Sequence, residues 1–360
     1  MNRISALIGA SALAVGIYAG YTHFFASPHF GSTEPVVAAL RANLENPQTS
    51  DLSPAIAAQN MIAALDPNAT TELVQVLDSK NRTRWSNLPA GIFNGRSGAK
   101  LGDLDEAGNA AVWDFLRAAL SQKGLQEITK IVLADKILGE TDGASRWGWG
   151  SDNFWISIYG TPSETGAWAW QFGGHHLALN VSVNGSEMIL SPFFFGTEPA
   201  NFEENGIQHN AMGNVPATAL TFMQLLDASQ RDAAIVSERP EEVYAGAGKD
   251  DVIPQQQGLL IDALDGPQAK ALEQLILEFV GVMPEPAAIK RMAAIRTEFP
   301  QSYFSWHGAT DGSSSIYFQF QSPSALIEFS TQGAIGADAG HYHAIYRNLS
   351  DDYGRSLLNQ

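Results

Sequence analysis

Half of the chain's eight histidines lie in two short segments, and these residues are the best candidates for chemistry. The first segment contains the pair His175-His176, and the second contains His341-Tyr342-His343. Both segments have the residue types of β-strands, in which residues i and i+2 point to the same face with Cα atoms about 6–7 Å apart. His341 and His343 can therefore direct two imidazoles toward one point, as the histidine ligands of a metal ion do.

The residues after the first pair indicate which of its histidines joins the others. Leucine and valine occupy the odd positions of residues 177–183, whereas alanine, asparagine and serine occupy the even positions. Strand alternation then places His176 on the polar face and His175 toward the core. We therefore predict a metal site formed by His176, His341 and His343, with His175 as a buried, hydrogen-bonded supporting residue.

Three neutral imidazole nitrogens suit zinc or a similar divalent transition metal and leave a coordination position for water or substrate. Glu328 is the candidate for a fourth ligand or a general base, because it interrupts the apolar strand 326–329. Two simpler interpretations stay open. Glu328 faces solvent in one, and in the other the histidines hydrogen-bond across a sheet without a metal.

Trp168 and Trp170 are candidates for a ligand pocket, because they share one face of the strand that leads into the first histidine pair. Such a pocket would take a small molecule, for example a sugar ring or an apolar ligand. The simpler alternative is that both indoles belong to the hydrophobic core.

The elements that must position these residues alternate in blocks along the chain. Helical periodicity dominates residues 32–136 and 216–298, whereas aromatic and β-branched residues dominate 154–195 and 303–347. Such segregation predicts an α+β fold with a mainly antiparallel sheet, built from both strand blocks and covered by both helical blocks. The sequence shows no internal repeat and no long linker, so residues 31–360 are predicted to form a single domain.

The composition narrows the classes of function. The formal net charge is −17, which disfavours nucleic acid as a partner, because such binders neutralise phosphates with lysine and arginine. The chain has no cysteine. Disulfides, thiolate zinc sites and cysteine nucleophiles are therefore excluded, and metal ligands must be histidine, carboxylate or backbone oxygen.

Residues 1–30 resemble an export signal or a membrane anchor. Arg3 precedes an uncharged run, residues 4–22, which as a helix would extend about 28 Å and reach across a bilayer core. We expect a cleaved signal peptide or an uncleaved anchor. The body is then periplasmic, or is held at the inner membrane and faces the periplasm.

Several ordered blocks resemble those of the family known as domain of unknown function 3500. The most specific is Gly173-Gly-His-His-Leu-Ala-Leu-Asn180, followed by Ser191-Pro-Phe-Phe-Phe-Gly-Thr-Glu-Pro-Ala200, Leu326-Ile-Glu-Phe329 and His341-Tyr-His343. The resemblance covers about residues 50 to 358. It implies a mostly bacterial, often exported protein, and it implies no particular activity.

Two classes of function follow from these observations. The first is an exported metal-dependent enzyme, most plausibly a hydrolase, with oxidoreductase chemistry as an alternative in the same site. The second is a periplasmic ligand-binding or structural protein without catalysis, which includes a former enzyme that has lost its supporting residues.

Overall fold

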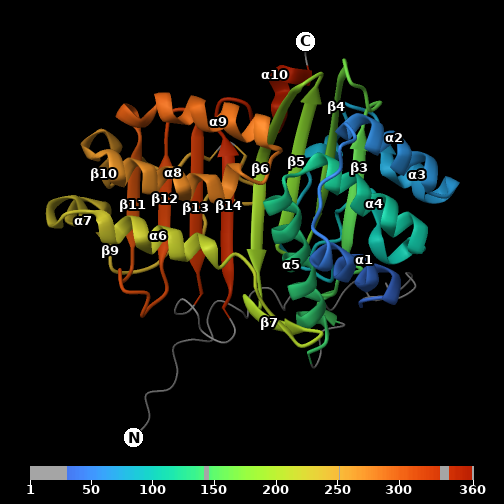
Figure 1. The fold of residues 1–360 in the computed structure, drawn as a ribbon, viewed down its shortest axis with the longest axis horizontal. Helices are drawn as coiled ribbons and strands as arrows, with labels where there is room; N and C mark the ends of the chain where they lie inside the picture. The colour runs from blue at the N-terminus through green and yellow to red at the C-terminus, as the bar shows by residue number, and fades with distance from the viewer. Residues whose placement is uncertain (1–30, 142–145, 251, 333–339, 359–360) are drawn as a thin grey trace, which may run out of the picture.

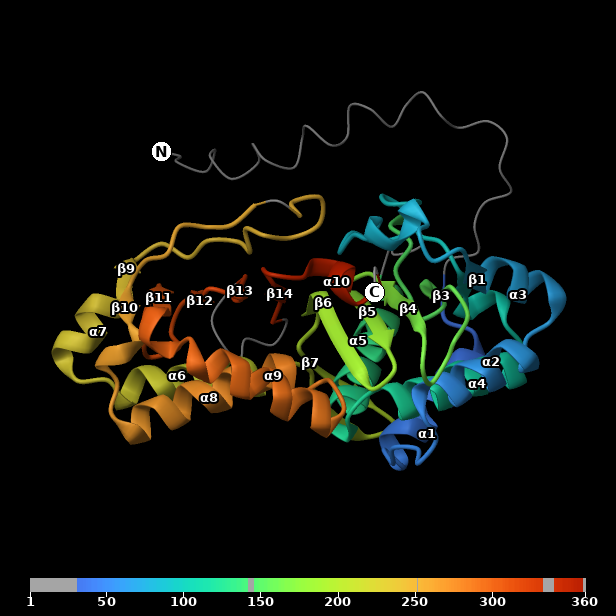
Figure 2. The same ribbon diagram turned by 90° about the horizontal axis from the view of Figure 1, so that it is seen from above.

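The computed structural model describes residues 31–141, 146–250, 252–332 and 340–358, whose strands form one large sheet with helices along one face (Figures 1 and 2). Twelve strands belong to this sheet, and a separate hairpin forms a second sheet of two strands. Most neighbouring strands are antiparallel. The α+β class is confirmed, and residues 154–195 and 303–347 contribute to the same sheet, as predicted.

The elements that build the sheet follow one another in the same order twice. The first repeat comprises α2 (Pro54–Ala64), α3 (Pro67–Leu73), β1 (Val74–Gln75), β2 (Ala99–Lys100), η3 (Leu101–Asp103), α4 (Glu106–Ala119), α5 (Gln122–Gly139), β3 (Phe154–Tyr159), β4 (Ala167–Gly174), β5 (Leu177–Asn184) and β6 (Glu187–Thr197). The second repeat comprises α6 (Asn214–Leu225), α7 (Ala228–Ala234), β9 (Ile235–Ser237), β10 (Leu259–Leu260), η5 (Ile261–Ala263), α8 (Gly266–Val280), α9 (Glu285–Thr297), β11 (Tyr303–His307), β12 (Tyr317–Gln321), β13 (Ala325–Thr331) and β14 (Tyr342–Asn348). The remaining elements are α1 (Glu34–Glu45), η2 (Lys80–Thr83), β7 (Asn201–Glu204), β8 (Ile207–Asn210), η6 (Phe299–Gln301), η7 (Asp352–Gly354) and α10 (Arg355–Leu358).

Strand pairing supports the correspondence between the repeats. In the first, Ser157 lies opposite Gln171 between β3 and β4; in the second, Ser305 lies opposite Gln319 between β11 and β12. The short strands agree as well, because β1 and β9 each run parallel to the first long strand of their repeat. The prediction that the chain has no internal repeat was wrong at the level of structure.

Two glycines occupy corresponding places for the same physical reason. Gly98 precedes β2 with φ +108°, and Gly258 precedes β10 with φ +91°. A Cβ atom would lie 2.1 Å from the carbonyl oxygen of Ile156 at Gly98, and 2.2 Å from that of Phe304 at Gly258. Backbone conformation and close packing therefore both require glycine there.

The repeats join at the centre of the sheet, where β6 pairs antiparallel with β14. From β3 to β11 the order is β3-β4-β5-β6-β14-β13-β12-β11. Each repeat therefore contributes four long strands, which follow one another in chain order from the edge of the sheet to its centre. We call the β6–β14 pair the seam. Gly196 lies opposite His343 in this pair, so the second histidine segment enters the sheet directly beside the first repeat.

Several helices begin where a side chain accepts hydrogen bonds from their free N–H groups. Asp66 caps α3, Asp105 caps α4 and Ser121 caps α5. Asp227 and Asp265 form capping boxes at α7 and α8 with the glutamines three residues later. These caps set the helix boundaries, and the packing of apolar side chains against the sheet supplies most of the stability.

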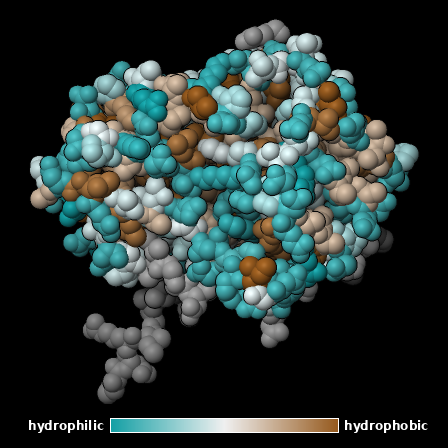
Figure 3. All heavy atoms as spheres, viewed as in Figure 1, coloured by the Kyte–Doolittle hydropathy of each residue, from teal (hydrophilic) through white to brown (hydrophobic). Residues whose placement is uncertain are grey.

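The helices cover one face of the sheet, and the main hydrophobic core lies between them and the strands (Figure 2). Leu177, Leu179 and Val181 of β5 point into this core, whereas Asn180 and Ser182 lie on the opposite face. The alternation predicted for β5 is confirmed. The outer surface of the helix layer is mostly hydrophilic, with scattered apolar side chains (Figure 3).

Long loops cross the face of the sheet that the helices leave open. Residues 76–98 follow β1, and residues 238–250, which we call the strap, follow β9 (Figure 2). Val243 and Ala247 of the strap pack onto a second, smaller apolar cluster formed by Trp85, Ala178, Phe194, Ile345 and Tyr353. The open face is therefore also packed against protein.

Residues 4–22, for which a signal or anchor was predicted, lie outside the described residues. Among the residues that the structure describes, no helix has the length and apolar character needed to cross a membrane.

Candidate metal centre

The first histidine pair forms a two-residue turn between β4, which ends at Gly174, and β5, which begins at Leu177. The prediction of a continuous strand through this pair was wrong. His176 has φ +59°, a backbone conformation that costs a non-glycine residue about 1–3 kcal/mol. Such a cost is tolerated only where the surrounding structure fixes the residue.

Three contacts fix the turn. Gly196 N donates to the carbonyl of His176 at 2.7 Å, and His176 N donates to the carbonyl of Asn87 at 3.4 Å. Arg96 Nη2 donates to the carbonyl of Gly174 at 2.8 Å. The turn thus projects the His176 side chain toward the seam, as predicted, although through a different local structure.

The second histidine segment enters β14, with His341 just before the strand and His343 within it. Gly196 makes room for the rings, because a Cβ atom there would lie 3.0 Å from Cδ2 of His343 and 3.2 Å from Cδ2 of His176. The two ligand segments can approach one another only because residue 196 has no side chain.

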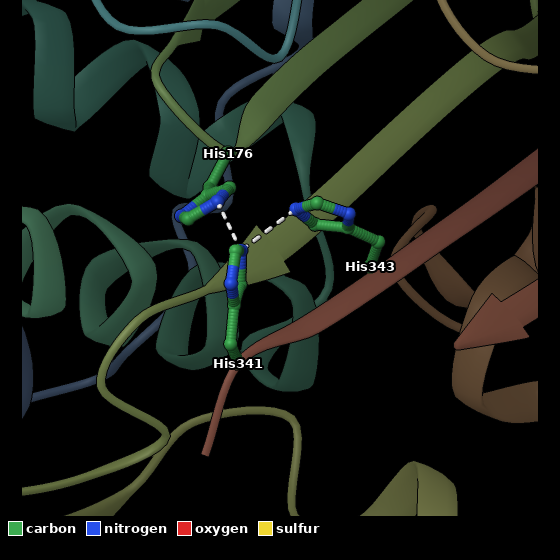
Figure 4. Close-up of side chains that lie close together, drawn as sticks. All are labelled: His176, His341 and His343. Carbon is green, nitrogen blue, oxygen red and sulfur yellow. Dashed lines mark hydrogen bonds between the residues drawn. The ribbon is translucent and has the colours of Figure 1, made fainter. Parts of the chain in front are cut away.

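The three predicted ligands meet, with their Nε2 atoms directed toward one another (Figure 4). Nε2 of His341 lies 3.0 Å from Nε2 of His176 and 2.9 Å from Nε2 of His343. One nitrogen from each ring falls within 4.8 Å of the others. Nitrogens about 2.0–2.1 Å from a tetrahedral zinc ion are roughly 3.3 Å apart, so small rotations would complete such a site.

Carboxylates contact the opposite nitrogen of two of these rings. Glu242 Oε1 lies 3.0 Å from Nδ1 of His343, and Glu198 Oε2 lies 3.7 Å from Nδ1 of His341. The contact of Glu242 is a hydrogen bond, and it holds the proton of His343 on Nδ1 and leaves Nε2 as a free lone pair, which is the arrangement of metal-binding histidines. The contact of Glu198 with His341 is too long for a hydrogen bond.

Hydrogen bonds alone explain the three rings poorly. A proton on Nδ1 of His343 makes its Nε2 an acceptor. Nε2 of His341 carries at most one proton and so can donate to only one of its two neighbours. A nitrogen that donates has no lone pair with which to accept, so with neutral rings a hydrogen bond to His343 leaves the short contact to His176 without one, whereas a cation among the three Nε2 atoms would account for both contacts.

His176 and His341 are in an environment that favours the neutral form needed for coordination. Burial, together with the neighbouring His343 and His175 rings, lowers the pKa of His341 to about 3. Burial and the other histidines also hold the pKa of His176 well below its ordinary value. Desolvation opposes ionisation of Glu242, but the hydrogen bond and the attraction from His343 outweigh it and lower its pKa to about 2.

His175 is buried behind His176. Its ring stacks on that of His176, with centroids 3.7 Å apart, and its Nδ1 lies 2.6 Å from Oδ1 of Asp135 on α5. The other oxygen of Asp135 accepts a hydrogen bond from Gly150 N at 3.0 Å. Trp149 stacks on the far side of His175, with a centroid distance of 6.3 Å.

Glu328 does not belong to the cluster, which corrects its predicted role as ligand or base. Its carboxylate is fully buried and accepts hydrogen bonds from the backbone N–H groups of Tyr244 and Ala245 and from the hydroxyl of Tyr317. The charge in an apolar strand has partners, but they belong to the strap and to β12.

Trp168 and Trp170 are core residues, which corrects the predicted ligand pocket. Both are essentially unexposed, and Trp170 packs edge-on against Phe115 of α4 with a centroid distance of 5.2 Å. The shared strand face that suggested a pocket is the face covered by helices.

Two further histidines lie apart from the cluster. His209 is on β8, where its ring packs against Phe202, and His307 ends β11 with its ring against Tyr317.

Sequence reasoning missed the three carboxylates Asp135, Glu198 and Glu242. Glu198 had a usable signal, because it lies in the same block as Gly196, close after the β6 strand. Glu242 had none, because the strap reaches the cluster through tertiary packing from 101 residues away.

The chain matches the model of a protein family of unknown function, DUF3500, over residues 49–355. The chain belongs to this family. The match confirms the resemblance drawn from the histidine blocks and includes all three candidate ligands. Comparisons with curated proteins and with solved structures found no match.

Proposed function

We propose that this protein is a metal-dependent hydrolase that binds one divalent transition metal ion, zinc or a similar ion, through Nε2 of His176, His341 and His343. The observation that carries the proposal is the convergence of three Nε2 atoms, with contacts of 3.0 and 2.9 Å, while carboxylates approach Nδ1 of two rings. Structural zinc sites use four protein ligands, whereas three ligands and an open position are typical of catalytic sites.

The chemistry follows from the donor set. A zinc ion held by His176, His341 and His343 would supply Lewis-acid chemistry and activate a water for hydrolysis at ordinary pH. The chain's own residues position the rings: Glu242 orients His343, Glu198 lies beside His341, and the turn held by Gly196 presents His176. A small-molecule substrate is the proposed partner.

We also propose that the protein is exported and acts in the periplasm, either free or anchored through residues 4–22. The support is the uncharged run after Arg3. Mass spectrometry of the amino terminus from a membrane and a soluble fraction distinguishes an anchor from a cleaved signal. A reporter fused after residue 40 that is active only in the cytoplasm would reject export.

Elemental analysis of protein purified without an affinity tag, followed by calorimetric titration of chelator-treated protein with Zn²⁺, tests the metal site. We expect about one ion per chain, and an affinity loss of about 100-fold or more in His341→Ala and His343→Ala. His176→Asn is the matched change in the turn, because asparagine tolerates positive φ. His209→Ala, outside the cluster, should bind as the wild type does.

The hydrolase assignment needs a separate test. Zinc-loaded and chelator-treated protein should be compared on ester, amide, phosphoester and glycoside substrates, and activity should follow metal occupancy. A metal bound at one ion per chain without such activity would favour the ligand-binding alternative. Substoichiometric metal that is unchanged in the His341→Ala and His343→Ala variants would overturn the metal site itself.

A further inference from the structure

The strap connects a buried carboxylate to the candidate metal site. Its residues Tyr244 and Ala245 each donate a backbone hydrogen bond of 2.8 Å to Glu328, one to each carboxylate oxygen. The hydroxyl of Tyr317 donates a third at 2.7 Å to Oε1. Glu328 thus fixes the strap backbone directly after Glu242.

Glu242 is held in place on the same face of the sheet. Its Oε1 accepts a hydrogen bond from Ser330 Oγ at 2.8 Å, and its Oε2 accepts one from Gln332 Nε2 at 2.9 Å. Ser330 lies opposite His343 in the β13–β14 register. Because Ser330 follows Glu328 by two residues, both point toward the strap. The same Oε1 of Glu242 lies 3.0 Å from Nδ1 of His343.

The first repeat shows that the fold itself does not require a carboxylate at this position. Asn180 there corresponds to Glu328, because each lies opposite the glutamine of the preceding strand, Gln171 or Gln319. Asn180 accepts from Gln171 Nε2 at 2.6 Å and donates to the carbonyl of Pro192 at 2.7 Å. A neutral amide therefore satisfies this place in the sheet, whereas Glu328 serves the strap.

We propose that Glu328 is a positioning residue of the metal site: it anchors the strap so that Glu242 holds the proton of His343 on Nδ1 and leaves Nε2 free for the ion. This inference rests on the proposed function. It replaces the role of ligand or base predicted for Glu328 with an action through two intermediates, the strap and Glu242.

A double-mutant cycle on the full chain tests the proposal, with the dissociation constant for Zn²⁺ as the readout. Glu242→Gln should weaken binding by about 10- to 100-fold, as losses of carboxylates behind metal-bound histidines do. Glu328→Gln should weaken it at least about fivefold. The double variant should bind no more weakly than Glu242→Gln alone, because both changes remove the same support.

Tyr353→Phe is the matched control, because it removes a hydroxyl that donates to Asp250 of the strap at 2.8 Å and accepts from Trp85 Nε1 at 3.0 Å, while the hydrogen bonds of residues 242–245 and the ring that packs under Val243 stay in place. It should bind zinc with wild-type affinity. Circular dichroism and thermal unfolding establish that each variant is folded. If Glu328→Gln does not fold, Tyr317→Phe removes one hydrogen bond from Glu328 and should give a smaller loss that disappears in the Glu242→Gln background.

The outcomes separate the two proposals. Suppose that the wild type binds zinc. If the losses of affinity in the two single variants then multiply in the double variant, or if Glu328→Gln shows no loss, the role of Glu328 is overturned and the metal site is retained. A Tyr353→Phe loss equal to that of Glu328→Gln would also overturn it, because any loosening of the strap would then suffice. Absence of zinc binding in the wild type would overturn the proposed function and this inference with it.

Discussion

At the scale of single residues, the cluster depends on Gly196 as much as on its nitrogen donors. This residue lies opposite His343 in the seam and donates its N–H to the carbonyl of His176. It thus contacts both ligand segments, and its missing side chain is the space in which the two rings approach.

Gly196→Ala should therefore impair metal binding while it leaves every donor in place. The new Cβ would lie 2.7 Å from the carbonyl oxygen of Tyr342 and 3.0 Å from the His343 ring, so β14 or the ring must shift. We expect at least about a tenfold rise in the dissociation constant for Zn²⁺, since misplaced donors cannot complete a tetrahedral site. Gly266→Ala, at a glycine in open space without a positive φ, is a control for general effects on folding. An unchanged affinity in Gly196→Ala would contradict the packing argument.

The types of the ligand residues could be predicted from sequence, but their supporting residues could not. In a strand, the two histidines of a His-x-His pattern point to the same face, so the pattern alone predicts that His341 and His343 lie together. The alternation of apolar and polar residues after the other pair identifies His176 as the third member. Glu242 is recognisable only once the strap is placed over β13. Glu328 was assigned wrongly because sequence shows that a buried charge needs partners without showing which ones.

At the scale of elements, a carboxylate at the end of a helix secures the same hairpin turn in both repeats. Asp135 on α5 contacts His175 in the β4–β5 turn. Glu298, the C-cap of α9, accepts hydrogen bonds from Ser322 and Ser324 in the β12–β13 turn. The second repeat keeps the contact but has no histidines in its turn, so the two sites form a natural comparison.

Asp135→Ala and Glu298→Ala should both destabilise the protein, and only the first should affect the metal. Each leaves buried donors without partners, which costs about 1–3 kcal/mol per group. Urea unfolding should show a loss of that order in both variants. Zinc titration should show weaker binding in Asp135→Ala alone, because His175 and the stacked His176 lose their support. Equal effects of the two changes on zinc affinity would show that general loosening, rather than the turn at His175, is responsible.

Another carboxyl of α5 gives the protein a pH dependence that is separate from the metal site. Burial raises the pKa of Glu127, which accepts a hydrogen bond from the backbone N–H of Met212 and lies 3.6 Å from Lys130. Its contribution to stability is complete below its ordinary pKa of 4.5 and is lost as pH rises through its folded value.

Glu127→Gln should remove this dependence while it keeps an acceptor for Met212. The free energy of unfolding of the variant, relative to wild type, should therefore rise between pH 4 and 7, by up to about 1.4 kcal/mol per pH unit over the range in which only the unfolded carboxyl is ionised. Urea unfolding at intervals of one pH unit measures the difference. If the free energies of unfolding of the variant and of the wild type change with pH in the same way, folding does not raise the pKa of Glu127.

The prediction of elements succeeded where periodicity is strong and failed where two neighbouring strands share one pattern. The helical blocks and both strand blocks appear as expected. Residues 167–183 look like a single apolar run, yet they form β4, a turn and β5, because Gly173-Gly174-His175-His176 carries no common hairpin signature. The assignment of side chains to the two faces of residues 177–183 was nevertheless correct, because β5 has the alternation on which that assignment was based.

At the scale of the whole molecule, the repeat was invisible to sequence inspection because so few side chains are shared. Ser157 and Ser305, Gly160 and Gly308, and Gln171 and Gln319 match, as do the two glycines before β2 and β10. These are positions where the backbone or a cross-strand contact is demanding. Core positions exchange freely among apolar types, for example Trp170 against Phe318, so they carry little recognisable similarity.

The proposed metal site straddles the two repeats, so a bound ion would contribute to the stability of the whole sheet. His176 belongs to the first repeat, whereas His341 and His343 belong to the segment that opens β14 in the second, and the seam joins them. An ion bound to the folded state alone stabilises it by about 2.7 kcal/mol at a free concentration 100 times its dissociation constant. Because an ion at the proposed site would span the seam, that stabilisation would apply to the association of β6 with β14.

We therefore expect zinc to raise the melting temperature of chelator-treated protein and to slow hydrogen exchange at the backbone amides of β6 and β14 near residues 196 and 343. The continuous sheet also predicts that both repeats unfold in one cooperative transition, as expected for a single domain covering residues 31–360. Calorimetry and exchange mass spectrometry measure the two effects. His209→Ala should retain the zinc-dependent shift, and His341→Ala should lose it. A shift of equal size in His341→Ala would place the stabilising ion elsewhere, and two separate transitions would show that the seam does not couple the repeats.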